Sequence, residues 1–174
     1  MYAPLPEGLI AIVRPPKIWE SLGLVPPGTL WTLQRAVYGL RCAPRAWGTY
    51  RDKELRGMRW QHSGKTYQLV QCVNDAQVWK ICQEGWSAPL GLLLMYVDDF
   101  MLLSPADEVQ AGLIKELQKK SNMSTNVFLS PATPMTFLGM EIERESKTGD
   151  LLIHQQSFVR QLLTKHGIDR TSNR

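Results

Sequence analysis

The sequence predicts a single α+β domain, in which an antiparallel sheet carries helices packed on one face. Two apolar runs, 90–95 and 100–103, enclose the adjacent acids Asp98 and Asp99, which is typical of a hairpin with a polar turn. Apolar residues recur every four positions within 105–119, as they do on the buried face of a helix. Strand and helix signals therefore alternate along the chain.

The N-terminal part is rich in proline and glycine, which argues against a central strand or helix there. We predict only two short strands, within 9–13 and 29–33. Pro44 stands where the first turn of a helix is expected. That helix should end near Arg56, because Gly57 follows.

The middle of the chain predicts two strands within 66–83, separated near Asn74 and Asp75. The hairpin of 90–103 follows. Ser104 then has the features of a helix cap, with proline next and an acid at the third position after it, so we expect a helix over 105–119.

The last part of the chain predicts alternating residues over 135–145, a turn, a strand at 151–153 and a helix over 155–166. Gly167 is a suitable C-terminal cap for that helix. We expect its apolar residues to face inward: Phe158, Leu162 and Leu163.

The composition is typical of a soluble globular protein, with 44% hydrophobic and 21% charged residues in 174 positions. No apolar stretch approaches the ~20 residues that span a bilayer, and the N-terminus lacks the pattern of a signal peptide. Three cysteines without Cys-x-x-Cys spacing favour a reducing compartment and argue against a zinc site: Cys42, Cys72 and Cys82.

The net charge of +4 is unevenly distributed. Between residues 14 and 65, ten Lys or Arg face three acids, whereas residues 66–174 hold ten Lys or Arg and twelve acids. The basic part also contains four of the tryptophans and two tyrosines, a composition typical of a nucleic-acid surface. A solvated basic face above a core of tryptophans would give the same pattern.

Asp98 and Asp99 are the strongest candidates for a metal site. Two carboxylates held side by side repel each other unless a cation lies between them, and hard oxygen donors suit Mg2+. An ordinary hairpin turn that contains two aspartates is the alternative.

Three blocks of residues, in order, resemble the reverse transcriptase of copia-type long-terminal-repeat retrotransposons. Residues 36–47 (Ala-Val-Tyr-Gly-Leu-Arg-Cys-Ala-Pro-Arg-Ala-Trp) are similar to the family's Leu-Tyr-Gly-Leu-Lys-Gln-x-Pro-Arg-x-Trp. Residues 95–100 are similar to its Tyr-Val-Asp-Asp hairpin, and 137–142 (Phe-Leu-Gly-Met-Glu-Ile) to a third block, which Gln155 and a helix follow. Spacing and order make the set far more specific than any one block.

The resemblance implies a role for each matching residue. Asp98 and Asp99 become the catalytic metal ligands, with Mg2+ as the cofactor and Mn2+ as an alternative. Nucleotide and template contacts are implied for five residues: Tyr38, Gly39, Arg41, Arg45 and Tyr96. Leu138 and Gly139 would form the primer grip. For the arginines, a solvated helix start is the alternative; for Gly139, it is a plain glycine bulge.

The resemblance also implies a polymerase palm-type sheet, with fingers and thumb largely missing. Residues 1–88 would form the junction of fingers and palm, 89–145 the palm core, and 146–174 the end of the palm and the start of the thumb. The implied partners are an RNA or DNA template with its primer, a deoxynucleoside triphosphate and the rest of a polyprotein with integrase and ribonuclease H, but no membrane. The expected location is intracellular, in a cytoplasmic particle or the nucleus.

Several positions depart from the family pattern. The family has a third metal-binding Asp upstream of the first block, whereas the only acids before Gly39 are Glu7 and Glu20. Cys42 replaces the usual Gln, and the loop 121–134 has no lysine to act as general acid, which leaves Lys119 and Lys120 as candidates.

We therefore expect an RNA-directed DNA polymerase domain whose 174 residues are inactive alone. Two alternatives remain: a nucleic-acid-binding remnant without catalysis, and an unrelated metal-binding α+β domain.

Overall fold

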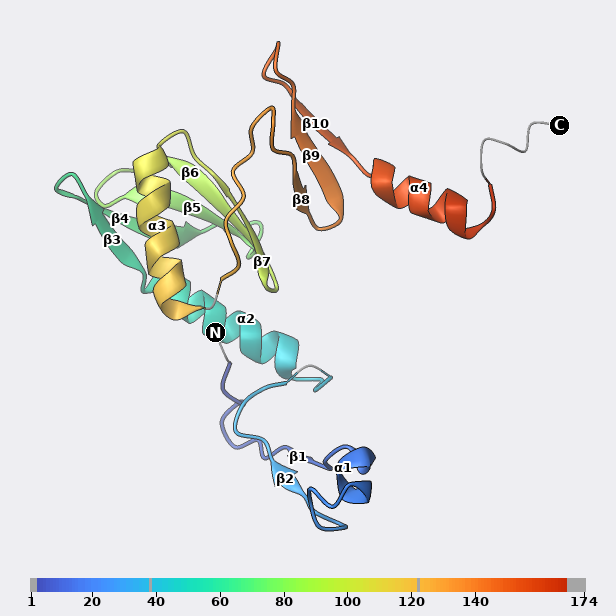
Figure 1. Ribbon diagram of the computed structural model, residues 1–174. Helices are drawn as coiled ribbons and strands as arrows, with labels where there is room; N and C mark the ends of the chain where they lie inside the picture. Colours follow the sequence, from blue (N-terminus) through green and yellow to red (C-terminus); the bar gives the residue numbers. More distant parts are fainter. Residues whose placement is uncertain (1–2, 38, 122, 169–174) are drawn as a thin grey trace. The chain divides into compact units, whose positions relative to one another are not determined.

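The computed structural model describes residues 3–37, 39–121 and 123–168. The chain divides into two compact units (Figure 1). Unit 1 comprises Met1–Val97 and Leu102–Asn122, and unit 2 comprises Asp98–Met101 and Met123–Arg174. Strands and four α-helices alternate in the described residues, which confirms the predicted α+β class.

The largest sheet is antiparallel and has the order β3-β4-β5-β6-β7. Its strands are connected in sequence, so each neighbouring pair forms a hairpin or a short meander. Their bounds are β3 Arg59–His62, β4 Lys65–Gln71, β5 Val78–Gln83, β6 Gly91–Tyr96 and β7 Asp99–Leu103. The prediction of two strands within 66–83 is confirmed, whereas β3 was not predicted.

One face of this sheet is buried. The pairing register places Trp60 beside Tyr67, Leu69 beside Ile81, and Trp79 beside Leu93 on the same face. All six side chains are buried, and the residues between them along the strands are mostly exposed or half-buried. This alternation is the period-2 pattern of a sheet with one face in a core.

Helices α2 (Ala43–Arg56) and α3 (Asp107–Lys120) both pack on the buried face. The Arg56 guanidinium of α2 lies over the Trp79 ring, 5.9 Å from its centroid. Gly112 of α3 lies directly against the Trp60 ring, where an added Cβ would be 2.6 Å from Cδ1. The prediction that these two helices share one face of the sheet is confirmed.

The start of α3 differs from the prediction, because Ser104 does not cap the helix. Its hydroxyl donates a hydrogen bond to the Leu90 carbonyl at 3.1 Å and accepts one from the Ala106 N–H at 3.2 Å. Ser104 thus fastens the end of β7 to the start of β6, and the helix begins only at Asp107. The helix over 44–56 was predicted almost as observed, with Gly57 following it.

The first part of unit 1 contains three short elements. β1 (Ile12–Val13) and β2 (Trp31–Thr32) pair antiparallel, within the two predicted strand segments. Helix α1 (Lys17–Ser21) was not predicted, and its Trp19 ring meets Trp31 edge to face at 5.4 Å. Among the described helices, none is long and apolar enough to cross a membrane.

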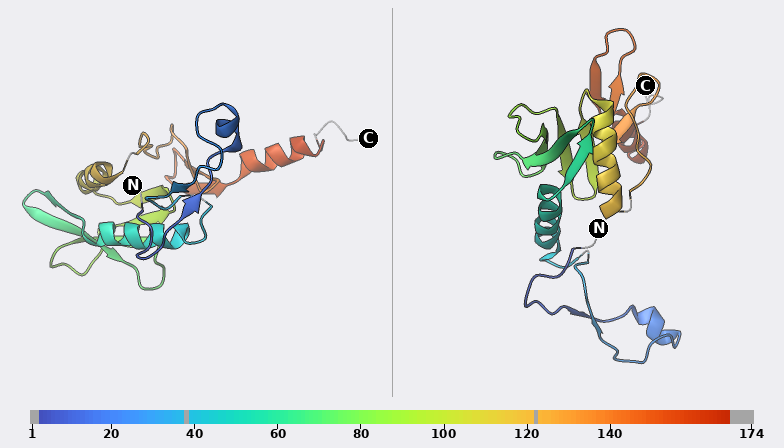
Figure 2. Two further views of the ribbon diagram at one scale, coloured as in Figure 1. Left: turned by 90° about the horizontal axis from the view of Figure 1, so that it is seen from below. Right: turned by 90° about the vertical axis from the view of Figure 1, so that its left-hand side faces the viewer.

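Unit 2 contains a three-stranded sheet with the order β10-β9-β8 and the helix α4. The bounds are β8 Met135–Phe137, β9 Met140–Arg144, β10 Leu151–His154 and α4 Gln156–Lys165. The α4 helix extends beyond the end of β10 (Figures 1 and 2). None of its residues is buried, so the inward orientation expected for Phe158, Leu162 and Leu163 is wrong; Phe158 is 52% exposed.

Candidate functional site

The segment 90–103 forms the predicted hairpin, with β6 and β7 joined by the two-residue turn Val97–Asp98. Asp98 and Asp99 are both exposed, so their carboxylates remain available to a ligand. Tyr96, the last residue of β6, is 53% exposed. The apolar runs on either side thus form strands while the acids stay at the tip, as the sequence predicted.

The backbone of the turn is strained at Val97, whose φ is +54°. A β-branched residue rarely adopts a positive φ, because its branched Cβ crowds the backbone, and such a conformation costs on the order of 1–3 kcal/mol. Asp98 is not among the residues with positive φ. A positive φ at the first central residue alone is typical of a type II′ turn, which normally has glycine at that position.

Trp47 of α2 contacts this turn from a distant part of the sequence. Its indole Nε1–H donates a hydrogen bond to the Val97 carbonyl oxygen at 2.9 Å, across 50 positions of sequence. That carbonyl belongs to the peptide group that links Val97 to Asp98. The first sequence block, which ends at Trp47, is thereby connected to the second.

One helical turn further along, Arg51 fastens α2 to the sheet. Arg51 is only 4% exposed, and its Nη1 donates to Gln77 Oε1 at 2.7 Å. The Gln77 carbonyl in turn accepts a hydrogen bond from the Met95 N–H of β6 at 2.9 Å. Arg51 also pairs with Asp52 at 2.7 Å, so the buried guanidinium has a counter-charge.

The first block otherwise lies around the start of α2. Gly39 has φ +93°, a conformation that favours glycine, and Arg41 and Arg45 are exposed. Within the described ranges neither guanidinium has a protein partner, so both remain available to phosphate oxygens. Tyr38 lies outside the described residues.

The third block forms a second two-residue turn, between β8 and β9. Leu138 has φ +51° and Gly139 has φ +76°, the combination of a type I′ turn. Phe137 pairs directly with Met140, so the strands contain no extra residue there and the glycine-bulge alternative is wrong. Leu138 is exposed, which leaves an apolar side chain at the tip of this hairpin.

The other candidate acids differ in their availability. Both oxygens of Asp52 are engaged, Oδ1 by Arg51 and Oδ2 by the Gln71 side-chain amide at 2.9 Å. Asp52 therefore serves the attachment of α2. Glu7 is exposed and Glu20 half-buried, with Glu7 in loop sequence and Glu20 in α1, not in a sheet strand.

Both lysine candidates for a general acid are paired in unit 1. The Lys119 ammonium lies 2.5 Å from Glu116 Oε1, and the Lys120 ammonium 2.5 Å from Glu54 Oε2. The hydrogen bond to Glu54 raises the pKa of Lys120, which weakens it as a proton donor.

A cluster that the sequence analysis missed lies on the β9–β10 hairpin. Glu141, Glu143 and His154 offer ligand atoms within 4.8 Å of one another, and Glu141 pairs with His154 across the strands. Glu141 also accepts hydrogen bonds from the Ser157 N–H at 2.7 Å and hydroxyl at 3.0 Å, and these hold its pKa below the ordinary value. The sequence alone did not reveal this cluster, because the register of β10 against β9 is what places His154 beside Glu141.

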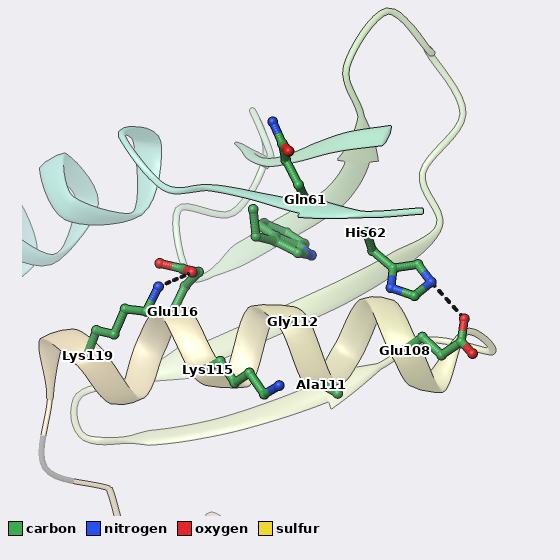
Figure 3. A pocket seen from close by; sticks show the side chains of 9 residues that line it. Gln61, His62, Glu108, Ala111, Gly112, Lys115, Glu116 and Lys119 are labelled. Carbon is green, nitrogen blue, oxygen red and sulfur yellow. Dashed lines mark hydrogen bonds and ion pairs between the residues drawn. The ribbon is translucent and has the colours of Figure 1, made fainter. Parts of the chain in front are cut away.

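A cavity of about 350 Å³ lies between β3 and α3, and of the predicted candidate residues only Lys119 is among those that line it (Figure 3). Its charges are largely paired: His62 Nε2 lies 2.8 Å from Glu108, and Lys119 binds Glu116. The buried Trp60 Nε1 has no hydrogen-bond partner there, because the ring packs against Gly112. The cavity is therefore a packing feature between a strand and a helix.

Comparison with known proteins agrees with the three sequence blocks. Residues 13–173 match a family described as reverse transcriptase (RNA-dependent DNA polymerase). The chain is 29% identical over 135 residues to the retrovirus-related Pol polyprotein from transposon TNT 1-94 of Nicotiana tabacum. That similarity covers 76% of this chain but only 9% of the polyprotein, so the chain spans a small part of its relative. No solved structure matches.

Proposed function

Because the chain belongs to the reverse transcriptase (RNA-dependent DNA polymerase) family, in its copia-type branch, we propose that it forms the palm part of an RNA-directed DNA polymerase. The observation that carries this proposal is the β6–β7 hairpin, which exposes the consecutive residues Asp98 and Asp99 at a strained turn. Strained backbone concentrates at functional sites, where the surrounding structure maintains it.

The two carboxylates fit a hard divalent cation. They are exposed, adjacent and oxygen-based, which suits Mg2+ better than a soft metal. In nucleotidyl transfer, such ions activate the attacking primer 3′-hydroxyl and neutralise the leaving pyrophosphate. Asp98 is the more direct ligand in our proposal, and Mn2+ can substitute for Mg2+ at the same oxygens.

The substrates of this site would be a primer annealed to an RNA or DNA template and a deoxynucleoside triphosphate. Arg41 and Arg45, exposed around the start of α2, would bind phosphates, and the positive φ of Gly39 would let the backbone approach the nucleotide. Tyr96 would lie near the primer end, and the exposed turn Leu138–Gly139 would hold the primer strand. The rest of the Pol polyprotein is the expected partner.

Metal binding can be tested without activity, by NMR of the 174-residue chain titrated with Mn2+. A paramagnetic ion broadens nearby amide signals, so residues 96–99 should broaden first. The replacements Asp98→Asn and Asp99→Asn should each weaken that broadening severalfold, and addition of Mg2+ should reverse it in the unmodified chain.

The Glu141, Glu143 and His154 cluster supplies the matched control within the same unit. The double replacement Glu141→Gln/Glu143→Gln should leave broadening at 96–99 unchanged. Broadening only around β9 and β10 would contradict the proposed metal site. Nucleic-acid binding without any metal binding at 96–99 would instead favour the non-catalytic remnant.

A further inference from the structure

We propose that Trp47 is a positioning residue for the metal-binding turn, an inference that rests on the proposed function of Asp98 and Asp99. The indole Nε1–H of Trp47 donates to the Val97 carbonyl at 2.9 Å. This carbonyl and the Asp98 N–H belong to one planar peptide group, so the orientation of that group determines where the Asp98 backbone begins.

The positive φ of Val97 is unfavourable for a β-branched residue. A contact from outside the turn is therefore needed to stabilise it. At φ +54° a β-branched residue is strained, and other backbone conformations are lower in energy for the isolated segment. A donor that binds the Val97 carbonyl only in the observed geometry shifts the population toward it. Trp47 is that donor in the structure.

The donor is itself held in place by a buried contact. Arg51 lies four residues after Trp47, one turn along α2, and is 4% exposed. Its hydrogen bond to Gln77 Oε1 attaches the helix beside Met95, because the Gln77 carbonyl accepts the Met95 N–H. Since Met95 precedes Val97 by two residues, α2 is connected to the end of β6 directly through Trp47 and Val97, and a second time through Gln77.

Trp47 is thus a positioning residue that acts through the peptide group. Loss of its donor should leave the helix and the sheet folded and change only the fraction of molecules with the observed turn. The apparent metal affinity then falls by that fraction. We expect a loss of roughly two- to tenfold, the usual worth of one hydrogen bond.

The test compares Trp47→Phe with Trp86→Phe in the 174-residue chain. Trp86 is 63% exposed in the loop between β5 and β6, so its replacement is a matched control. The first readout is the intraresidue HN–Hα NOE of Val97, which is strong when φ is positive. It should weaken in Trp47→Phe and persist in Trp86→Phe. An unchanged NOE in Trp47→Phe would overturn the proposal.

The second readout is the Mn2+ midpoint for broadening at residues 96–99, expected to rise roughly two- to tenfold in Trp47→Phe. Adding Val97→Asn should restore it, because Asn tolerates a positive φ, whereas adding Val97→Thr should not. Equal behaviour of the Asn and Thr variants would overturn the positioning role, because loss of packing alone does not distinguish them.

The two readouts keep the two proposals separate. If the unmodified chain shows no broadening at 96–99, the proposed metal function fails, while the Val97 NOE still decides the contact of Trp47 with the turn. If Trp47→Phe does not fold, a benzothienylalanine side chain at position 47 keeps the bicyclic shape and lacks only the donor. It should give the same weakened NOE, and a full-strength NOE would overturn the proposal.

Discussion

The two hairpin turns Val97–Asp98 and Leu138–Gly139 have the same length, but they accommodate a positive φ differently. At the second turn both residues have positive φ, and Gly139 occupies the position with +76°. At the first turn Val97 adopts +54°, and the following residue is an aspartate. Glycine therefore occupies one of the two central positions of the second turn and neither position of the first, where the residue with positive φ is β-branched.

The two turns also differ in the side-chain hydrogen bonds that their carbonyls accept. The Val97 carbonyl receives a hydrogen bond from Trp47 of a helix 50 positions away in sequence. Across the described residues, no side chain donates a hydrogen bond to the carbonyl of Leu138 or Gly139. Strained backbone that a distant side chain contacts is typical of a functional site, whereas glycine lets a two-residue turn adopt a positive φ without such a contact.

The largest effect should come from removing the attachment of α2. We expect Arg51→Ala to lower the free energy of unfolding by about 2 kcal/mol, because it removes a buried guanidinium with its hydrogen bonds to Gln77 and Asp52 and leaves the half-buried Asp52 carboxylate without its nearest counter-charge. Chemical denaturation measures this change. Arg45→Ala on the exposed side of the same helix should change stability by less than about 0.5 kcal/mol. A loss below 1 kcal/mol in Arg51→Ala would mean that α2 does not hold the first turn.

Removing the glycine of the second turn and adding one to the first should affect stability unequally. Gly139→Ala places a side chain at φ +76° where no atom lies within 4 Å of the new Cβ, so its cost is conformational, about 1–2 kcal/mol. Val97→Gly removes strain but adds backbone freedom, so its net effect should stay below about 1 kcal/mol. Amide hydrogen exchange in β8–β9 and in β6 measures each change locally. Equal destabilisation by both replacements would remove the distinction between the turns.

Charge near the first block should govern nucleic-acid binding. The double replacement Arg41→Ala/Arg45→Ala should lower affinity for a primer–template duplex and reduce the slope of log K against log salt by about 2. Titrations at several salt concentrations give the slope. Arg144→Ala/Lys147→Ala, at exposed positions around the end of β9, is the matched control and should leave the slope unchanged. If the control variant lowered the slope of log K against log salt instead, the binding surface would lie on unit 2.

The smallest effect concerns acid pH and the β9–α4 connection. Hydrogen bonds from Ser157 lower the pKa of Glu141 below its ordinary value of 4.5, so the ionised carboxylate stabilises the start of α4. Because the folded-state pKa is the lower one, this stabilisation is present above the unfolded-state pKa and is lost as the pH falls through the folded-state value. NMR signals of α4 should show this acid-dependent loss of helix, and Glu141→Gln should abolish the dependence. Glu143→Gln should retain it.

The fold could be predicted where the signal was local. The apolar runs around Asp98 and the proline at position 44 each describe one element, so both the hairpin and α2 were expected at nearly their observed bounds. Ser104 misled the prediction of α3, because its hydroxyl binds Leu90 of the neighbouring strand. Strand β3 was missed since its four residues carry little alternation.

For the candidate site too, some features could be predicted from the sequence and others could not. The metal-binding role of Asp98 and Asp99 and the roles of the other block residues follow from motif resemblance and remain predictions. The contact between Trp47 and Val97 and the cluster of Glu141, Glu143 and His154 could not be predicted, because each joins residues through tertiary packing or strand register. Sequence motifs thus indicate which residues matter, and the structure indicates which of them act together.

Anomalous diffraction from crystals of the chain soaked in Mn2+ tests the central claim most directly. We expect an anomalous peak within coordination distance of the Asp98 and Asp99 carboxylates, and no such peak in the Asp98→Asn variant. A peak confined to Glu141, Glu143 and His154, with none at the Val97–Asp98 turn, would contradict it.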